Sequence, residues 1–179
     1  TMEKEGEIQY TATAVCDGKT YTDVRSVSIP KLVAKPAGTS MEFSATLYHV
    51  TKAGATPELA YMGPKNKKVK TVTIPATVKI DGITYKVTSV ATGALKNYKN
   101  LTKVTVGANV TKIGKNAFYG CKKLKKIIIK SKKLKSVGKN AFKGIKKNAT
   151  IDVPNSKKKA YKKLFKAKTG YKKKTMKVK

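Results

Sequence analysis

The sequence contains no Trp, one Arg, one His and only nine acidic residues among 179. A nucleophilic triad needs a His beside its nucleophile, and no catalytic motif surrounds His49, the single His. Paired-carboxylate catalysis needs acids that lie close together, whereas Asp152 is the only acid after Asp81. We therefore expect a protein that is not an enzyme and that holds no cofactor and no metal ion.

Cysteine and long apolar runs are also scarce. The two cysteines, Cys16 and Cys121, form no C-x-x-C pair and no cluster of metal ligands. Cys121 occupies an apolar position of a repeat, which favours a buried and inert thiol. A Cys16–Cys121 disulfide is the alternative, because sequence alone does not fix connectivity. No run of 18 apolar residues occurs, so we expect no membrane span.

Basic residues, by contrast, are abundant and unevenly placed. The formal net charge is +32, and residues 83–179 carry 30 basic groups against one acid. Forty of the 41 basic residues are Lys, whereas specific recognition of bases and phosphates favours the planar fork of Arg. We therefore expect no specific nucleic-acid partner, and either a solvated coat or a diffuse attraction for polyanions. Our candidate contacts for a polyanion are Lys122, Lys123, Lys125, Lys126, Lys157, Lys158 and Lys159.

The most informative feature is a pattern that occurs twice. Residues 101–123 read LTKVTVGANVTKIGKNAFYGCKK, and residues 124–147 read LKKIIIKSKKLKSVGKNAFKGIKK. A fixed period in this range is typical of repeat proteins. The apolar positions common to both copies predict the core: Leu101, Val104, Val106, Ile113 and Phe118, then Leu124, Ile127, Ile129, Val137 and Phe142.

One copy is too small to be stable alone, because burial of its few apolar side chains does not offset the entropy lost by its ordered backbone. Neighbouring copies must share hydrogen bonds and cover each other, as in a solenoid. The apolar runs KVTV and KIII predict short strands. Gly114 and Gly138 then interrupt the chain before Asn-Ala-Phe, which predicts a tight or single helical turn.

These segments resemble the BspA-type leucine-rich repeats of bacterial surface proteins. The shared pattern is Leu, a short apolar strand, Val-x-x-Ile-Gly, Asn-Ala-Phe, Gly-Cys and Leu. The second copy departs from it at Ile145, where the pattern has Cys, and carries one extra residue before Leu134. The resemblance implies a β-rich solenoid of short strands with brief helical turns, and a role in adhesion and in host or matrix contact.

The N-terminal part predicts two β-hairpins. In residues 1–31, Asp17-Gly18 separates two alternating runs, a hairpin signal. This hairpin resembles the last two strands of an immunoglobulin-like or fibronectin-like module, so it is a domain that was cut, or it docks on the following part. Pro30 to Ser40 is predicted as a linker. Residues 41–68 are expected to cap the repeats through a strand over 43–49 and a second strand around Leu59 and Tyr61.

Residues 69–154 are expected to form the repeats and residues 155–179 the C-terminal cap. The first repeat carries an insert around Asp81-Gly82, which we expect to project as a small ribbon. In the cap, Asn155 or Ser156 begins a helix and Gly170 ends it, followed by a strand over 175–178. The helical spacing of Ala160, Tyr161, Leu164 and Phe165 indicates one apolar face. A basic amphipathic helix that binds a membrane surface or a partner is the alternative.

These observations favour a non-catalytic extracellular module of a bacterial surface protein. We expect residues 41–179, the leucine-rich-repeat domain, to bind a protein or matrix ligand through the repeat face. Electrostatic retention on an anionic wall polymer through the Lys-rich C-terminal half is the second hypothesis. The chain begins at Thr1 without a signal peptide, and we interpret it as a mature or shortened piece of a longer secreted protein at the cell surface or cell wall.

Overall fold

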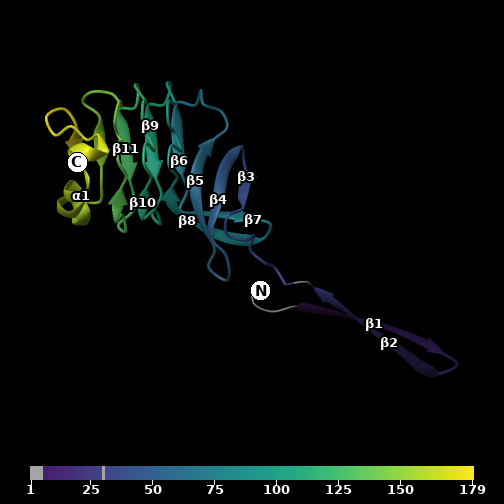
Figure 1. The fold of residues 1–179 in the computed structure, drawn as a ribbon. Helices are drawn as coiled ribbons and strands as arrows, with labels where there is room; N and C mark the ends of the chain where they lie inside the picture. The colour runs from purple at the N-terminus through teal and green to yellow at the C-terminus, as the bar shows by residue number, and fades with distance from the viewer. Residues whose placement is uncertain (1–5, 30) are drawn as a thin grey trace.

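The computed structural model describes residues 6–29 and 31–179. The chain forms a solenoid whose coils lie side by side, and a long hairpin extends away from its N-terminal end (Figure 1). Residues 1–5 and Pro30, part of the predicted hairpin region and of the predicted linker, lie outside the described residues.

A parallel sheet of five strands runs along the solenoid. In spatial order its strands are β6 (Thr71–Ile74), β9 (Lys103–Val106), β11 (Lys126–Ile129), β13 (Thr150–Asp152) and β14 (Lys177–Val178). Equivalent positions of the two sequence copies are direct neighbours, because Val104 pairs with Ile127 and Val106 with Ile129. The predicted leucine-rich-repeat solenoid is therefore confirmed.

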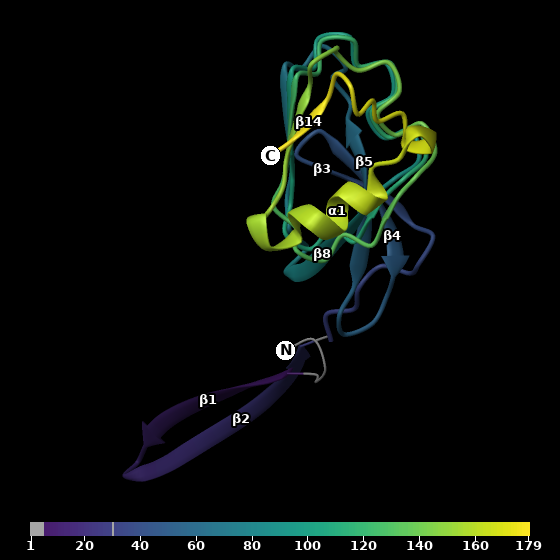
Figure 2. The same cartoon turned by 90° about the vertical axis from the view of Figure 1, so that its left-hand side faces the viewer.

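A second sheet of seven strands forms another side of each coil. Its parallel part comprises β5 (Glu58–Pro64), β8 (Ile83–Val90), β10 (Lys112–Ile113) and β12 (Ser136–Val137). Its antiparallel additions are β3 (Ser40–Phe43), β4 (Thr46–Lys52) and β7 (Thr77–Ile80). Viewed along the solenoid, the successive coils superpose (Figure 2).

An aromatic column occupies the interior of the coils. The rings of Phe118 and Phe142 are stacked, with centroids 5.9 Å apart and planes 10° from parallel. The structure also buries the other residues of the predicted core, except that Val137 is half-buried and packs against the core from its edge. Each coil therefore covers the apolar side chains of the next.

Glycine permits this close stacking at two equivalent positions. A Cβ atom at Gly114 would lie 2.6 Å from the backbone nitrogen of Thr92 in the preceding coil, and one at Gly138 would lie 2.5 Å from that of Lys115. No side chain fits at such distances. The following Asn116 and Asn140 adopt positive φ of 56° and 57°, which Asn tolerates better than most residues. The predicted turn before each Phe therefore depends on the close backbone contact at Gly and on the positive φ of Asn.

The N-terminal end of the solenoid differs from prediction in two ways. The predicted strand over 43–49 is broken between β3 and β4, because Ser44 and Ala45 adopt positive φ and reverse the chain. The Asp81-Gly82 insert forms the predicted two-residue hairpin of β7 and β8, but it does not project as a ribbon. Val78, Ile80 and Tyr85 of this hairpin are buried, so it covers the core instead.

The N-terminal hairpin consists of β1 (Gly6–Cys16) and β2 (Lys19–Ile29), joined at Asp17-Gly18 as predicted. Residues 7–28 are all exposed, including Tyr10 and Tyr21 on one face. The described hairpin residues therefore contribute little burial to the solenoid.

The C-terminal cap is more broken than the single helix predicted. A 3₁₀ turn (Asn155–Lys157) leads into α1 (Lys158–Leu164), and a second 3₁₀ turn (Ala167–Thr169) ends at Gly170, which adopts φ 82°. Tyr161 and Phe165 are buried as expected, whereas Ala160 is exposed. The segment still covers the last repeat, because Phe165 packs edge-to-face on Phe142 at 5.6 Å.

Tyr161 joins this cap to residues 131–134 of the last repeat, next to its one extra residue. Its hydroxyl donates to the Ser131 carbonyl at 3.0 Å and accepts from the Leu134 N–H at 2.9 Å. Tyr161→Phe leaves both buried backbone groups without this partner and should lower the free energy of unfolding by about 1–3 kcal/mol. Chemical denaturation followed by circular dichroism measures the change. Tyr10→Phe on the exposed hairpin is the matched control, and an equal loss in both variants would contradict this role.

We propose that residues 1–31 form a unit separate from the repeat domain of residues 41–179. Because the described hairpin side chains are exposed, deletion of residues 1–29 should leave the melting temperature unchanged. Deletion of residues 155–179, which bury Tyr161 and Phe165, should lower it and serves as the positive control. A lower melting temperature after the N-terminal deletion would mean that the hairpin docks on the solenoid.

Candidate binding surfaces

The outer face of the five-stranded parallel sheet forms a regular surface along the repeats. Side chains alternate along a strand, so Val104 and Val106 point into the core while Lys103 and Thr105 point out. The parallel register repeats this arrangement on every strand. The outward positions form two rows, the first being Thr71, Lys103, Lys126, Thr150 and Lys177 and the second Thr73, Thr105, Ile128 and Asp152.

This sheet face combines hydroxyl groups, ammonium groups, one carboxylate and one apolar side chain. Asp152 accepts an ion pair from Lys126, with 3.2 Å between Oδ2 and Nζ. Asp152 Oδ1 is buried and has no hydrogen-bond partner. Ile128 is half-buried at the centre of the second row. The face therefore offers mostly hydrogen-bond donors and positive charge around a small apolar centre.

A second surface, the lysine groove, lies where these strands begin. It is a cavity of about 440 Å³ whose walls include Lys125, Lys126, Lys146 and Lys147. The neighbouring Lys122 and Lys123 are exposed, and Lys123 Nζ donates to Asn100 Oδ1 at 3.3 Å. Four ammonium groups around one depression create a positive potential that attracts anionic groups.

The predicted polyanion contacts fall into two groups. Lys122 to Lys126 precede or begin β11, whereas Lys157 to Lys159 follow β13. Because these strands are parallel, the two groups lie at opposite ends of the sheet face. Lys157 and Lys158 are also half-buried, while Lys159 is exposed. The structure therefore brings only the first group together around the groove.

The His, Cys and acidic side chains of the described residues do not gather at one place. Within residues 6–29 and 31–179, no three His, Cys, Asp or Glu residues come together as metal ligands. His49 Nδ1 lies 3.3 Å from Ser40 Oγ in the N-terminal cap. Both cysteines are free, Cys16 exposed and Cys121 buried. Burial raises the pKa of the Cys121 thiol to about 11, and its Sγ donates to the Leu95 carbonyl at 2.9 Å. Cys121 is thus a packed thiol, consistent with the first of our two alternatives.

Lys126 is the only outward residue of the sheet face that was predicted as a contact, and Lys146 and Lys147 of the groove were not predicted. The sheet face could be predicted from sequence, because its outward residues alternate with the predicted core residues along each strand. The groove was harder to predict, since Lys125 and Lys147 meet only through the stacking of successive coils.

The stacked coils and parallel sheets define a leucine-rich-repeat solenoid, and comparison with known families agrees. A family described as BspA type leucine rich repeat region (6 copies) matches residues 88–178, just over half of the chain. The chain belongs to this family of BspA-type leucine-rich-repeat proteins. The predicted resemblance is therefore confirmed.

Solved structures of bacterial leucine-rich-repeat proteins share the fold. A leucine rich cell surface protein of Faecalibacterium prausnitzii is 26% identical with a TM-score of 0.50, over 67% of this chain and 34% of that one. A leucine-rich repeat protein of Bacteroides capillosus is 24% identical with a TM-score of 0.53, over 65% of this chain and 83% of that one. The chain thus matches about one third of the length of the F. prausnitzii protein. A comparison with curated proteins finds no match.

Among the described residues, no helix has both the length and the apolar character needed to cross a membrane.

Proposed function

We propose that this chain is a non-catalytic binding module of a bacterial surface protein, which holds a macromolecular partner on its sheet face. The observation that carries this proposal is the register of the five strands, which sets Thr, Lys and Ile128 side chains in rows on one continuous surface. Repeat proteins commonly use such extended surfaces for binding. Membership of the BspA-type family and the likeness to a cell surface protein support an extracellular location, at the cell surface or cell wall.

The composition of the face favours a protein or matrix ligand with a polar, acidic surface. Lys103 and Lys177 supply positive charge, while Thr73 and Thr105 both donate and accept hydrogen bonds. Ile128 provides an apolar contact near the centre, where binding energy usually concentrates. A partner that presents carboxylates around an apolar patch would match this arrangement.

Two substitutions at the centre of the face test this role. Thr105→Glu with Ile128→Glu removes the apolar contact and adds two negative charges, so affinity for an immobilised matrix protein should fall about tenfold or more. Solid-phase binding to a panel of extracellular-matrix proteins is the measurement.

The matched control is Thr92→Glu with Ser136→Glu, which adds the same charge at exposed positions outside the sheet face. Its affinity should stay close to that of the unchanged chain. Equal losses in both double variants, or binding no stronger than that of an unrelated protein of the same net charge, would refute use of the face for adhesion.

A second function, electrostatic retention on an anionic wall polymer such as teichoic acid, is favoured by the lysine groove. The groove gathers four lysines in one depression. The excess of Lys over Arg suits diffuse attraction to a flexible polyanion better than geometric recognition. Each contact would release a counterion, by analogy with polyphosphate chains, so retention would depend steeply on salt.

Retention on isolated cell walls tests this function. Lys125→Gln, Lys146→Gln and Lys147→Gln together should release the protein at lower salt, and the slope of log affinity against log salt should fall by about 2–3. Lys115→Gln, Lys139→Gln and Lys143→Gln remove the same charge from exposed positions outside the groove. Equal shifts for both sets, or retention that persists at about 1 M salt, where the Debye length is about 3 Å, would contradict the groove mechanism.

A further inference from the structure

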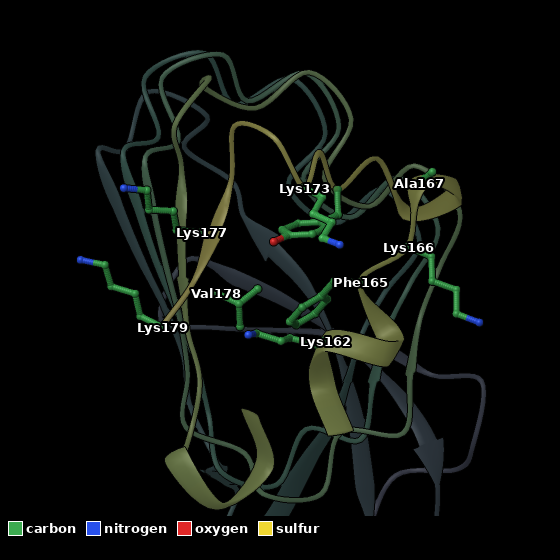
Figure 3. A pocket seen from close by; sticks show the side chains of 9 residues that line it. Lys162, Phe165, Lys166, Ala167, Lys173, Lys177, Val178 and Lys179 are labelled. Atoms are coloured by element: carbon green, nitrogen blue, oxygen red, sulfur yellow. The ribbon is translucent and has the colours of Figure 1, made fainter. Parts of the chain in front are cut away.

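A larger cavity lies at the C-terminal end of the solenoid, away from the sheet face and the lysine groove. It has a volume of about 840 Å³ and is lined by residues of α1, of the following turn and of β14 (Figure 3). Small-molecule sites in proteins usually measure about 300–1,000 Å³. The cavity is therefore large enough for an organic ligand.

Aromatic and aliphatic side chains form the inner wall of this cavity. Phe165 is buried against Phe142, and its ring centroid lies 6.0 Å from that of Tyr171. The Tyr171 hydroxyl donates to the Met176 carbonyl at 3.0 Å, which anchors the ring to the last turn. Val178 adds an apolar side chain from the opposite side (Figure 3). The apolar wall is thus formed before any ligand arrives.

The charged side chains around the cavity are all positive. Five of the nine lining residues are lysines, and none is acidic. Lys162 extends toward Val178, and Lys173 reaches into the cavity from the other side, whereas Lys166 points away (Figure 3). The nearest acid in sequence, Asp152, is paired with Lys126 on the sheet face. Lys162 and Lys173 therefore have no acidic partner among the residues that line this cavity.

We propose that this end cavity binds a small amphipathic organic anion. An aromatic or aliphatic body would lie on Phe165, Tyr171 and Val178, and its carboxylate, sulfonate or phosphate would meet Lys162 and Lys173. An inorganic anion gains nothing from the apolar wall, and a neutral hydrocarbon gains nothing from the ammonium groups. The combination selects ligands that have both parts. This inference goes beyond the proposed function, because it concerns residues outside the sheet face and the groove.

Fluorescence titration of the full chain with 8-anilinonaphthalene-1-sulfonate tests the site. This probe has an aromatic body and one sulfonate, and it brightens when it leaves water. We expect saturable binding of one probe per chain. Lys162→Gln with Lys173→Gln should weaken binding about tenfold, since each lost charge pair is partly exposed. The neutral probe N-phenyl-1-naphthylamine should bind both forms equally. Val178→Ser, which shortens the apolar wall, should weaken both probes.

The matched control is Lys86→Gln with Lys112→Gln, which removes the same charge from exposed positions outside the sheet face, the groove and the end cavity. All four lysines are exposed, so neither double substitution alters the core. Binding that does not saturate, that survives Lys162→Gln with Lys173→Gln, or that falls equally in the control would overturn the proposal. Each of these outcomes leaves the sheet-face hypothesis unaffected, because that hypothesis is tested separately by Thr105→Glu with Ile128→Glu and by binding to matrix proteins.

Discussion

Contact between successive coils is the constraint on which the rest of this structure depends. The coils meet through parallel backbone hydrogen bonds on two sides, through the stacked rings of Phe118 and Phe142 inside, and through glycine positions at which no Cβ fits. None of these contacts exists within a single copy. The fold is therefore stable only as an array, and both ends need elements that are not repeats: the β3–β5 strands with β7 at one end, and α1 with β14 at the other.

This same constraint produces the binding surfaces. Because every strand has the same register as its neighbour, outward side chains line up in rows whether or not the residues attract each other. The rows give the sheet face its order, and the stacking of the loops before β11 and β13 brings Lys125 and Lys147 into one groove. Architecture and surface chemistry thus have a common origin in the repeat spacing, with the side chains at outward positions free to vary.

The repeats could be predicted from sequence because their signals are local and occur twice. Leu101 and Phe118 have counterparts in the next copy, and Asp17-Gly18 and Asp81-Gly82 are strong hairpin signals. The errors arise where tertiary contacts decide. Ser44-Ala45 carries no strong turn signal, yet the pairing of β3 with β4 requires the chain to reverse at these two residues. The predicted long helix ends early because Phe165 turns inward onto Phe142. The end cavity involves Lys162, Tyr171 and Val178, whose proximity no local pattern encodes.

The in-register lysines of the sheet face have a further consequence. Lys103 stands directly beside Lys126, and Asp152 relieves the repulsion only on the far side of Lys126. Neighbouring strands are about 4.8 Å apart, well inside the Debye length of about 8 Å at physiological ionic strength. Dissolved ions therefore have opposite effects on the stability of the solenoid and on its binding to anionic polymers. Salt that weakens the binding of this protein to an acidic polymer also screens the repulsion between like charges along the strands. The free energy of unfolding of the solenoid would therefore be highest under the conditions that release the protein.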